Sequence, residues 1–151
     1  MNIDTKKKLY KLCLDYIENK IDGEMFAMSA AQDAANSEDK NSAGDKHDTG
    51  RAMAHLEKEK YAKQIAVSYE IKKVLFQINV EKEYSEVLPG CIVTTNHGNF
   101  FIAINVGNLE LDGEIYTTIS LASPLGKELF NKRTKDVFQF RDKKYKILSI
   151  I

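Results

Sequence analysis

The stretch SAGDKHDTGRAM, residues 42 to 53, separates two long runs in which apolar residues recur every three or four positions. This spacing places the apolar residues of each run on one face of a helix. The first run contains Tyr10, Leu14, Ile17, Ile21, Met25, Met28, Ala31 and Ala35. The second contains Met53, Leu56, Ala62, Ile65, Val67, Ile71, Val74, Leu75 and Ile78. Because the polar stretch between the runs is short, the sequence predicts an antiparallel helical hairpin, a coiled coil, over residues 1–84.

The hairpin is predicted to be long and to narrow toward a tip near residues 41–49. At 1.5 Å per residue, each helix would extend roughly 50 Å. Small side chains near the tip let the two helix backbones approach closely; they are Ala30, Ala31, Ala34 and Ala35 on one arm and Ala52 and Ala54 on the other. Gly23 costs about 1 kcal/mol relative to Ala in a helix, so a bend or break near it is expected. Residues 36–50 are predicted to be weakly structured.

From about residue 85 the pattern changes to short runs rich in β-forming residues. They are GCIVTT (90–95), FFIAINV (100–106), IYTTISL (115–121), DVFQF (136–140) and YKILSI (145–150), with the turn-like NHGN at 96–99. In ASPLGKELF (122–130), Ser123 can cap a short helix and Pro124 can take its first position. Residues 85–151 are therefore predicted to form a small antiparallel β domain with one short helix. The chain as a whole is predicted to be an α+β protein.

Charge is balanced overall but not locally. The 22 Lys and Arg residues equal the 22 Asp and Glu residues, so a general electrostatic attraction to nucleic acid or an anionic membrane is not expected. A protein partner or a small ligand is favoured. Residues 81–114 carry six acidic residues and one lysine, whereas residues 127–151 carry eight basic residues and three acidic ones. Such an asymmetry can orient docking, although a solvated sheet surface has the same composition.

Neither a signal peptide nor a membrane span is expected. The N-terminus is charged, and no stretch approaches the roughly 18 apolar residues that a span requires. A cytoplasmic location is the resulting expectation.

Cys13 and Cys91 lie in apolar surroundings without CxxC spacing, so both are predicted to be reduced core residues.

Asp45 and Asp48 are the acidic residues of the predicted tip, and their spacing allows two interpretations. Two acids three apart at a helix start cap the backbone and complement the helix dipole. The same spacing also puts two carboxylates near one face, as a shared ligand set requires.

His47 and His55 are about 12 Å apart along a helix, too far for one ion. No phosphate-binding Gly-rich loop, GxSxG or HExxH motif is present, and Cys91 has no neighbouring motif that would activate it, so an enzyme acting by itself is not expected.

Two motifs together resemble the Gre-type transcript cleavage factors of bacterial RNA polymerase. The first is Gly44-Asp45-Lys46-His47-Asp48, which resembles the family's tip motif between the arms of an N-terminal coiled coil. The second is Ser123-Pro124-Leu125-Gly126-Lys127-Glu128-Leu129, followed by Lys132 and Asp136-Val137, which resembles its C-terminal signature. With the order of hairpin and then β domain, the resemblance covers nearly the whole chain.

The resemblance implies a specific role in transcription. Members of this family insert the hairpin through the polymerase secondary channel, and their tip acids help to hold a second Mg²⁺ at the polymerase active site. This stimulates hydrolysis of backtracked RNA near its 3′ end. By position, Asp45 and Asp48 are the two acids. The C-terminal domain is implied to be FKBP-like and to dock at the channel mouth, with Ser123, Pro124 and Lys127 as the expected contacts, although Lys127 could equally be solvated. Recognition of a DNA sequence is not expected.

The tip departs from the family pattern in two ways. The family usually has Glu as the second acid, where Asp48 is one methylene shorter. Thr49-Gly50-Arg51-Ala52 stands where the family has Asn-Ala-Glu-Tyr, so a cation lies close to the acids. A regulator that binds the channel without cleavage is therefore an alternative. A coiled-coil scaffold or oligomerisation protein unrelated to transcription is an alternative of another class.

Overall fold

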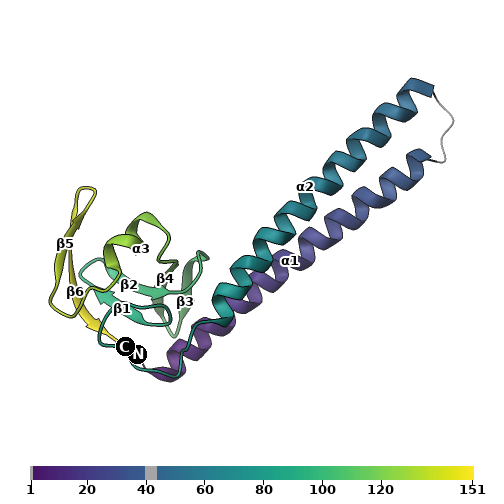
Figure 1. Cartoon of the computed structure of the whole chain (residues 1–151). Coiled ribbons are helices and arrows are strands. Elements are labelled where there is room, and N and C mark those ends of the chain that lie inside the picture. Colours follow the sequence, from purple (N-terminus) through teal and green to yellow (C-terminus); the bar gives the residue numbers. More distant parts are fainter. Residues whose placement is uncertain (1, 40–43) are drawn as a thin grey trace. The chain divides into compact units, whose positions relative to one another are not determined.

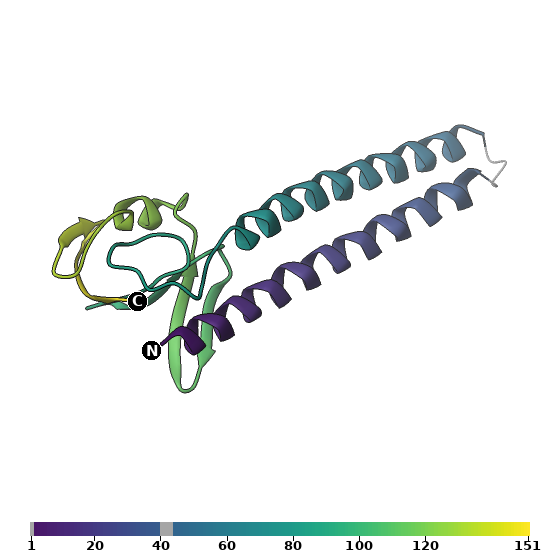
Figure 2. The same cartoon turned by 60° about the horizontal axis from the view of Figure 1, so that its bottom comes forward.

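Two long helices make up the first half of the chain in the computed structural model (Figure 1). The structure describes residues 2–39 and 44–151, and for residues 38, 39 and 44–48 it gives the helical backbone without side chains. α1 spans Ile3–Asp39 and α2 spans Gly44–Phe76, with 37 and 33 residues. The helices run antiparallel, side by side, in Figures 1 and 2, which confirms the predicted hairpin.

Two local predictions about the helices are wrong. α1 continues through Gly23, because packing of a long helix face outweighs the modest cost of one glycine. Residues 36–50 were predicted to be weakly structured, but 36–39 and 44–50 are helical, and residues 40–43 lie outside the described residues.

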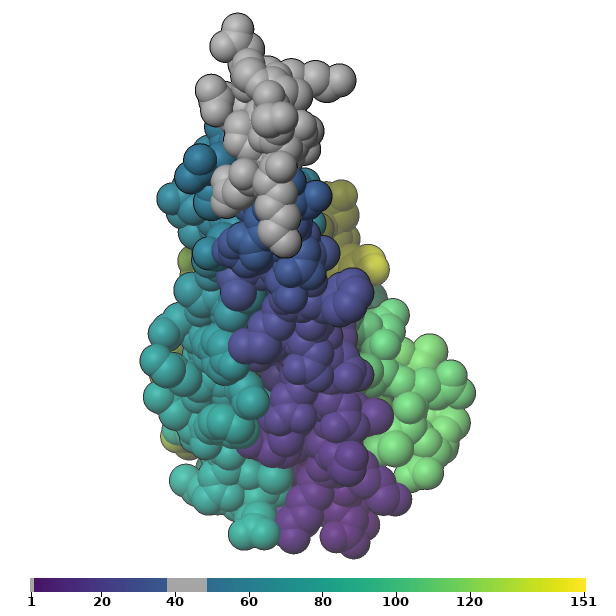
Figure 3. Space-filling model, turned by 90° about the vertical axis from the view of Figure 1, so that its right-hand side faces the viewer, coloured from purple at the N-terminus to yellow at the C-terminus, as the bar shows by residue number. Residues whose placement is uncertain are grey.

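The row of side chains between the helices differs from the predicted apolar faces. On α1 the buried row is Ile17, Ile21, Glu24, Ala31 and Ala35, and on α2 it includes Ala54, Ile65, Ser68 and Leu75. The predicted face residues Met25, Met53, Leu56, Ala62, Val67 and Val74 are exposed instead. Residues that recur in alternating steps of three and four stay on the side of a helix that faces its partner. Glu24 and Ser68 follow this alternation and their apolar neighbours Met25 and Val67 do not, so Glu24 and Ser68 are the buried residues. Figure 3 shows the two helices in contact along this seam.

The contacts divide the chain into two compact units. One is Ile17–Lys72, which contains most of the hairpin. The other combines Met1–Tyr16 with Lys73–Ile151, so the first turns of α1 and the last turn of α2 belong with the sheet. The domain break near residue 85 stays a prediction; α2 ends at Phe76, and β1 begins at Ile92.

The second half of the chain forms a six-stranded sheet in the order β3-β4-β2-β1-β6-β5. The strands are β1 (Ile92–Thr95), β2 (Gly98–Ile102), β3 (Gly107–Leu111), β4 (Glu114–Ile119), β5 (Val137–Phe140) and β6 (Lys143–Ile150). All neighbouring pairs are antiparallel except β2 and β4, which run parallel. The α+β class is thus confirmed, but the sheet is mixed. The sequence analysis missed β3 because its residues GNLEL lack the β-branched and aromatic side chains that mark a strand.

Both faces of the sheet are covered within this unit. One face packs with the short helix α3 (Pro124–Leu129) in a core formed by Val87, Cys91, Val93, Phe100, Ile102, Leu129, Tyr145 and Ile147. Side chains alternate along a strand, so Phe101 and Thr118 lie on the opposite face. There the side chain of Thr118 interacts with that of Cys13 on α1. The sheet is consequently held between α3 and the start of α1.

Candidate functional site

Asp45 and Asp48 belong to the first turns of α2, which begins at Gly44. Their side chains lie outside the described residues. Because the backbone is helical from Gly44, the two positions are three apart on a helix and share one face. The arrangement is compatible both with two ligands for one ion and with simple stabilisation of the helix start by acids.

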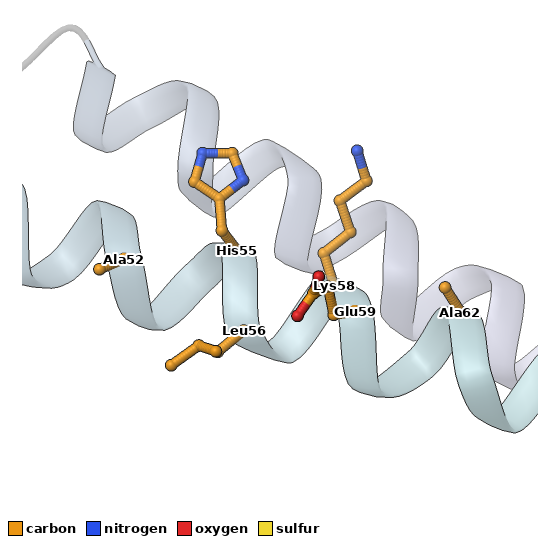
Figure 4. A pocket seen from close by; sticks show the side chains of 6 residues that line it. All are labelled: Ala52, His55, Leu56, Lys58, Glu59 and Ala62. Atoms are coloured by element: carbon orange, nitrogen blue, oxygen red, sulfur yellow. The ribbon is translucent and has the colours of Figure 1, made fainter.

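A shallow groove follows α2 just beyond these positions (Figure 4). It encloses about 530 Å³ and is lined by Ala52, His55, Leu56, Lys58, Glu59 and Ala62. His55 and Lys58 extend to the same side of α2, and Leu56 points to another. The side chain of His47 lies outside the described residues. Among the side chains that the structure describes, no group of three or more His, Cys, Asp or Glu residues could hold a metal ion.

The second sequence motif forms and caps α3. The Ser123 Oγ accepts a hydrogen bond of 3.1 Å from the Gly126 N–H and donates one of 2.7 Å to the Ser120 carbonyl. Pro124 follows at the start of the helix, as predicted. A Cβ at Gly126 would lie 2.1 Å from the Ser120 carbonyl oxygen, so only glycine fits there. Ser123 and Gly126 thus have structural roles, whereas Pro124 and Lys127 are exposed.

The two cysteines are free and buried, as predicted. Burial raises the pKa of Cys13 to about 12, and the neighbouring Thr118 side chain opposes this only in part. Burial likewise raises the pKa of Cys91 to about 11, against smaller opposing contributions from the Leu88 backbone and from Lys6. Thiols that stay protonated and inaccessible are poor nucleophiles.

Lys6 is a buried cation that the sequence analysis did not single out. Its Nζ donates to the carbonyl oxygen of Lys82 and lies 4.8 Å from the centre of the Tyr84 ring. Desolvation lowers the pKa of Lys6, and nearby Cys91 and Glu83 partly offset this. These contacts tie the first turn of α1 to the segment that follows α2.

The strand order separates the charges that the sequence showed to be uneven. The acidic residues Glu110, Asp112 and Glu114 belong to the β3–β4 hairpin at one edge of the sheet. The basic residues Arg141, Lys143, Lys144 and Lys146 belong to the β5–β6 hairpin at the other edge. The sequence showed that the charges are unevenly distributed, but not that they lie at opposite edges of the sheet. The pattern of residues within a strand does not determine the order of the strands in the sheet.

No match to this chain was found among protein-family models, curated proteins or solved structures. No helix among the described residues is long and apolar enough to cross a membrane.

Proposed function

We propose that this protein is an accessory factor of bacterial RNA polymerase that inserts its helical hairpin into the secondary channel and modulates elongation by stimulating cleavage of backtracked RNA. The observation that carries the proposal is a long antiparallel hairpin with the acidic motif Asp45-x-x-Asp48 at the start of its second arm. At 1.5 Å per residue, α2 extends about 50 Å, long enough to reach a recessed site.

The form of the far part of the hairpin supports entry into a channel. Ala31, Ala35 and Ala54 are the buried residues of its inner row there. Small side chains allow helix axes to come close together, so this part of the hairpin has a small cross-section.

The acids would act on the polymerase's own active site, and the protein would not be an enzyme by itself. Carboxylate oxygens are suitable ligands for Mg²⁺, and Asp45 and Asp48 on one helix face fit a shared ion of that kind. A second metal ion stabilises the attacking and leaving oxygens of a phosphodiester. Asp45 and Asp48 would therefore supply ligands and orient water, and the exposed Pro124 and Lys127 would contribute to docking on the polymerase.

A non-catalytic channel-binding regulator is the second candidate function. Arg51 lies one turn along α2 from Asp48, where its charge reduces the local negative potential that favours a metal ion. Asp48 is also one methylene shorter than the Glu that is usual at this position in the Gre-type family, which this sequence resembles. A regulator of this kind would occupy the channel and compete with a cleaving factor without producing RNA fragments. A coiled-coil scaffold unrelated to transcription is the remaining candidate, and it would not bind the polymerase at all.

The test uses RNA polymerase halted in a backtracked complex with labelled RNA. We expect the wild-type protein to shorten the RNA in the presence of Mg²⁺, and Asp45→Asn with Asp48→Asn to abolish the shortening. Asp33→Asn is the matched control, since Asp33 is an exposed acid on the other arm. Equal shortening by the double variant would overturn the catalytic role.

Binding measurements on the same complex separate the alternatives. Binding to the polymerase without cleavage, together with competition against a cleaving factor, would identify the regulator. If the protein does not bind the polymerase, the coiled-coil scaffold is the remaining candidate function.

A further inference from the structure

β5 forms one edge of the sheet and offers main-chain groups that β6 does not use. Within the described residues, β6 is the only strand paired with β5, and Val137 lies opposite Lys146 while Gln139 lies opposite Lys144. Lys146 uses its main-chain N–H and carbonyl for hydrogen bonds to Asn96, of 2.8 and 3.2 Å. The Lys144 carbonyl likewise accepts from the Asn96 side chain, at 3.0 Å. Because these groups are directed toward β1, the main-chain groups of Val137 and Gln139 point away from β6.

Exposed side chains beside this edge are basic and apolar. Val137 and Leu148 are 48% and 49% exposed. Residues opposite one another in an antiparallel pair share a face, so Val137 and Gln139 lie on the same side as Lys144 and Lys146. A ligand strand placed along β5 would meet these two lysines.

β5 is short, with four residues, but two other common protections against pairing are absent from it. Edge strands commonly carry a charge or a proline that prevents another strand from adding to them. β5 has the sequence VFQF and carries neither, whereas the strand at the other edge, β3, contains Glu110. The lysines lie on β6, where they attract an acidic partner without obstructing the β5 edge.

Aromatic contacts also hold the strand from its inner side. Phe138 stacks on Tyr145 with ring centres 5.1 Å apart and planes 6° apart, and His97 meets the same tyrosine edge-on at 4.8 Å. A strand already fixed in its binding geometry loses little conformational entropy when a ligand is added.

From these observations we infer that the β5 edge binds an extended, acidic segment of a partner protein as an additional β-strand. Main-chain hydrogen bonds from Val137 and Gln139 would supply affinity, and Lys144 and Lys146 would select acidic side chains on one face of the ligand strand. This inference does not depend on the role proposed for the hairpin.

A single-stranded nucleic acid fits the same surface less well. Base stacking requires open aromatic faces, but Phe138 is stacked on Tyr145, and Arg141 lies 5.0 Å from the centre of the Phe140 ring. A nucleic acid also cannot reproduce the main-chain pairing of a strand.

The experiment measures fluorescence anisotropy of a short fluorescein-labelled peptide that alternates Glu and Val, titrated with the full-length protein. We expect saturable binding that weakens with salt. The same peptide N-methylated on alternate backbone nitrogens keeps its charge but loses strand pairing, so we expect about tenfold weaker binding or more.

Protein variants test the same contacts from the other side. Lys144→Glu with Lys146→Glu should abolish binding, and Lys60→Glu with Lys63→Glu, the same charge change on the exposed face of α2, should not. Val137→Pro removes an outward N–H at the first residue of an edge strand, where proline is tolerated, and should weaken binding while leaving the thermal unfolding transition intact.

Three results would overturn the inference. They are absence of binding, equal binding of the N-methylated peptide, and tighter binding of a single-stranded oligothymidylate than of the peptide. Concentration-dependent self-association without peptide, seen by sedimentation, would show instead that the edge pairs with a second copy of the chain.

Discussion

Ser68 on α2 donates a hydrogen bond of 2.6 Å from its Oγ to the Oε1 of Glu24 on α1, inside the row of side chains between the two helices. Only 1% of Ser68 and 8% of Glu24 are exposed. The Nζ of Lys20 lies 3.8 Å from the same carboxylate oxygen, and the Oε2 has no hydrogen-bond partner among the described residues. A buried carboxylate is costly unless it is paired, so the hydroxyl of Ser68 offsets part of the cost of Glu24.

We predict that Ser68→Ala destabilises the hairpin although it improves helix propensity. Removing the donor leaves a buried carboxylate short of a partner, which costs about 1–3 kcal/mol. Thermal unfolding followed by the helical circular dichroism signal should show a lower midpoint. Ser29→Ala, an exposed serine on α1, should not lower it.

A double variant tests whether the loss of stability in Ser68→Ala comes from the unpaired carboxylate of Glu24 or from another effect of the substitution. Glu24→Leu combined with Ser68→Ala replaces both partners by apolar groups and should recover the stability that Ser68→Ala loses. If the double variant is less stable than the wild-type protein, the polar pair contributes net stability. If it is no more stable than Ser68→Ala, the loss in the single variant does not come from the unpaired acid.

The long helices were predictable from the sequence, but their packed row was not. Apolar spacing identified both helices, because a run of more than thirty residues contains many repeats of the pattern. It assigned Met25 and Val67 to the interface, where Glu24 and Ser68 lie instead. Pairing of two polar side chains across the interface made this register possible, and such pairing is visible only when both helices are placed.

Some of the candidate functional residues could likewise be predicted from the sequence, and others could not. Asp45 and Asp48 could be selected from the motif alone, and so could Ser123 and Pro124, whose capping role was foreseen. The β5 edge could not be found from the sequence, since it depends on which strand lies last in the sheet. Parallel pairing of β2 with β4 was likewise invisible, because strand patterns carry no direction.

Gly126→Ala should strongly destabilise the unit that contains the sheet. The added Cβ would lie 2.1 Å from the Ser120 carbonyl oxygen and 2.8 Å from the Leu121 Cα, both backbone atoms that cannot move aside. We expect a loss of at least 1–3 kcal/mol, the usual range for overpacking a core. Urea unfolding followed by tyrosine fluorescence measures the change, and an unchanged midpoint would show that α3 can shift away from the sheet.

Gly23→Ala should have the opposite effect. Gly23 is exposed in the middle of α1, and a Cβ there would meet no atom within 4 Å. Alanine is favoured over glycine in a helix interior, so we expect a gain of about 0.5–1 kcal/mol in the free energy of unfolding of the hairpin. Gly98→Ala is the matched control: it also has open space, but its φ of +113° disfavours any side chain, so it should lose stability. Loss of stability in Gly23→Ala would reveal a requirement for glycine that the helix geometry does not explain.

The buried thiols predict a loss of stability in alkaline solution. The pKa of Cys91 is raised from 9.0 to about 11 and that of Cys13 to about 12, so the folded protein keeps protons that the unfolded chain releases. The unfolded state then binds fewer protons, and the free energy of unfolding falls as pH rises above 9, by about 2–3 kcal/mol for Cys91 by pH 11. The lowered pKa of Lys6 acts in the opposite direction near its ordinary value of 10.5 and reduces the net fall. Urea unfolding between pH 8 and pH 11 should therefore show a downward slope that becomes shallower in Cys91→Ala. An identical slope in that variant would mean that other groups control the alkaline transition, such as Tyr116, whose pKa is also raised by burial.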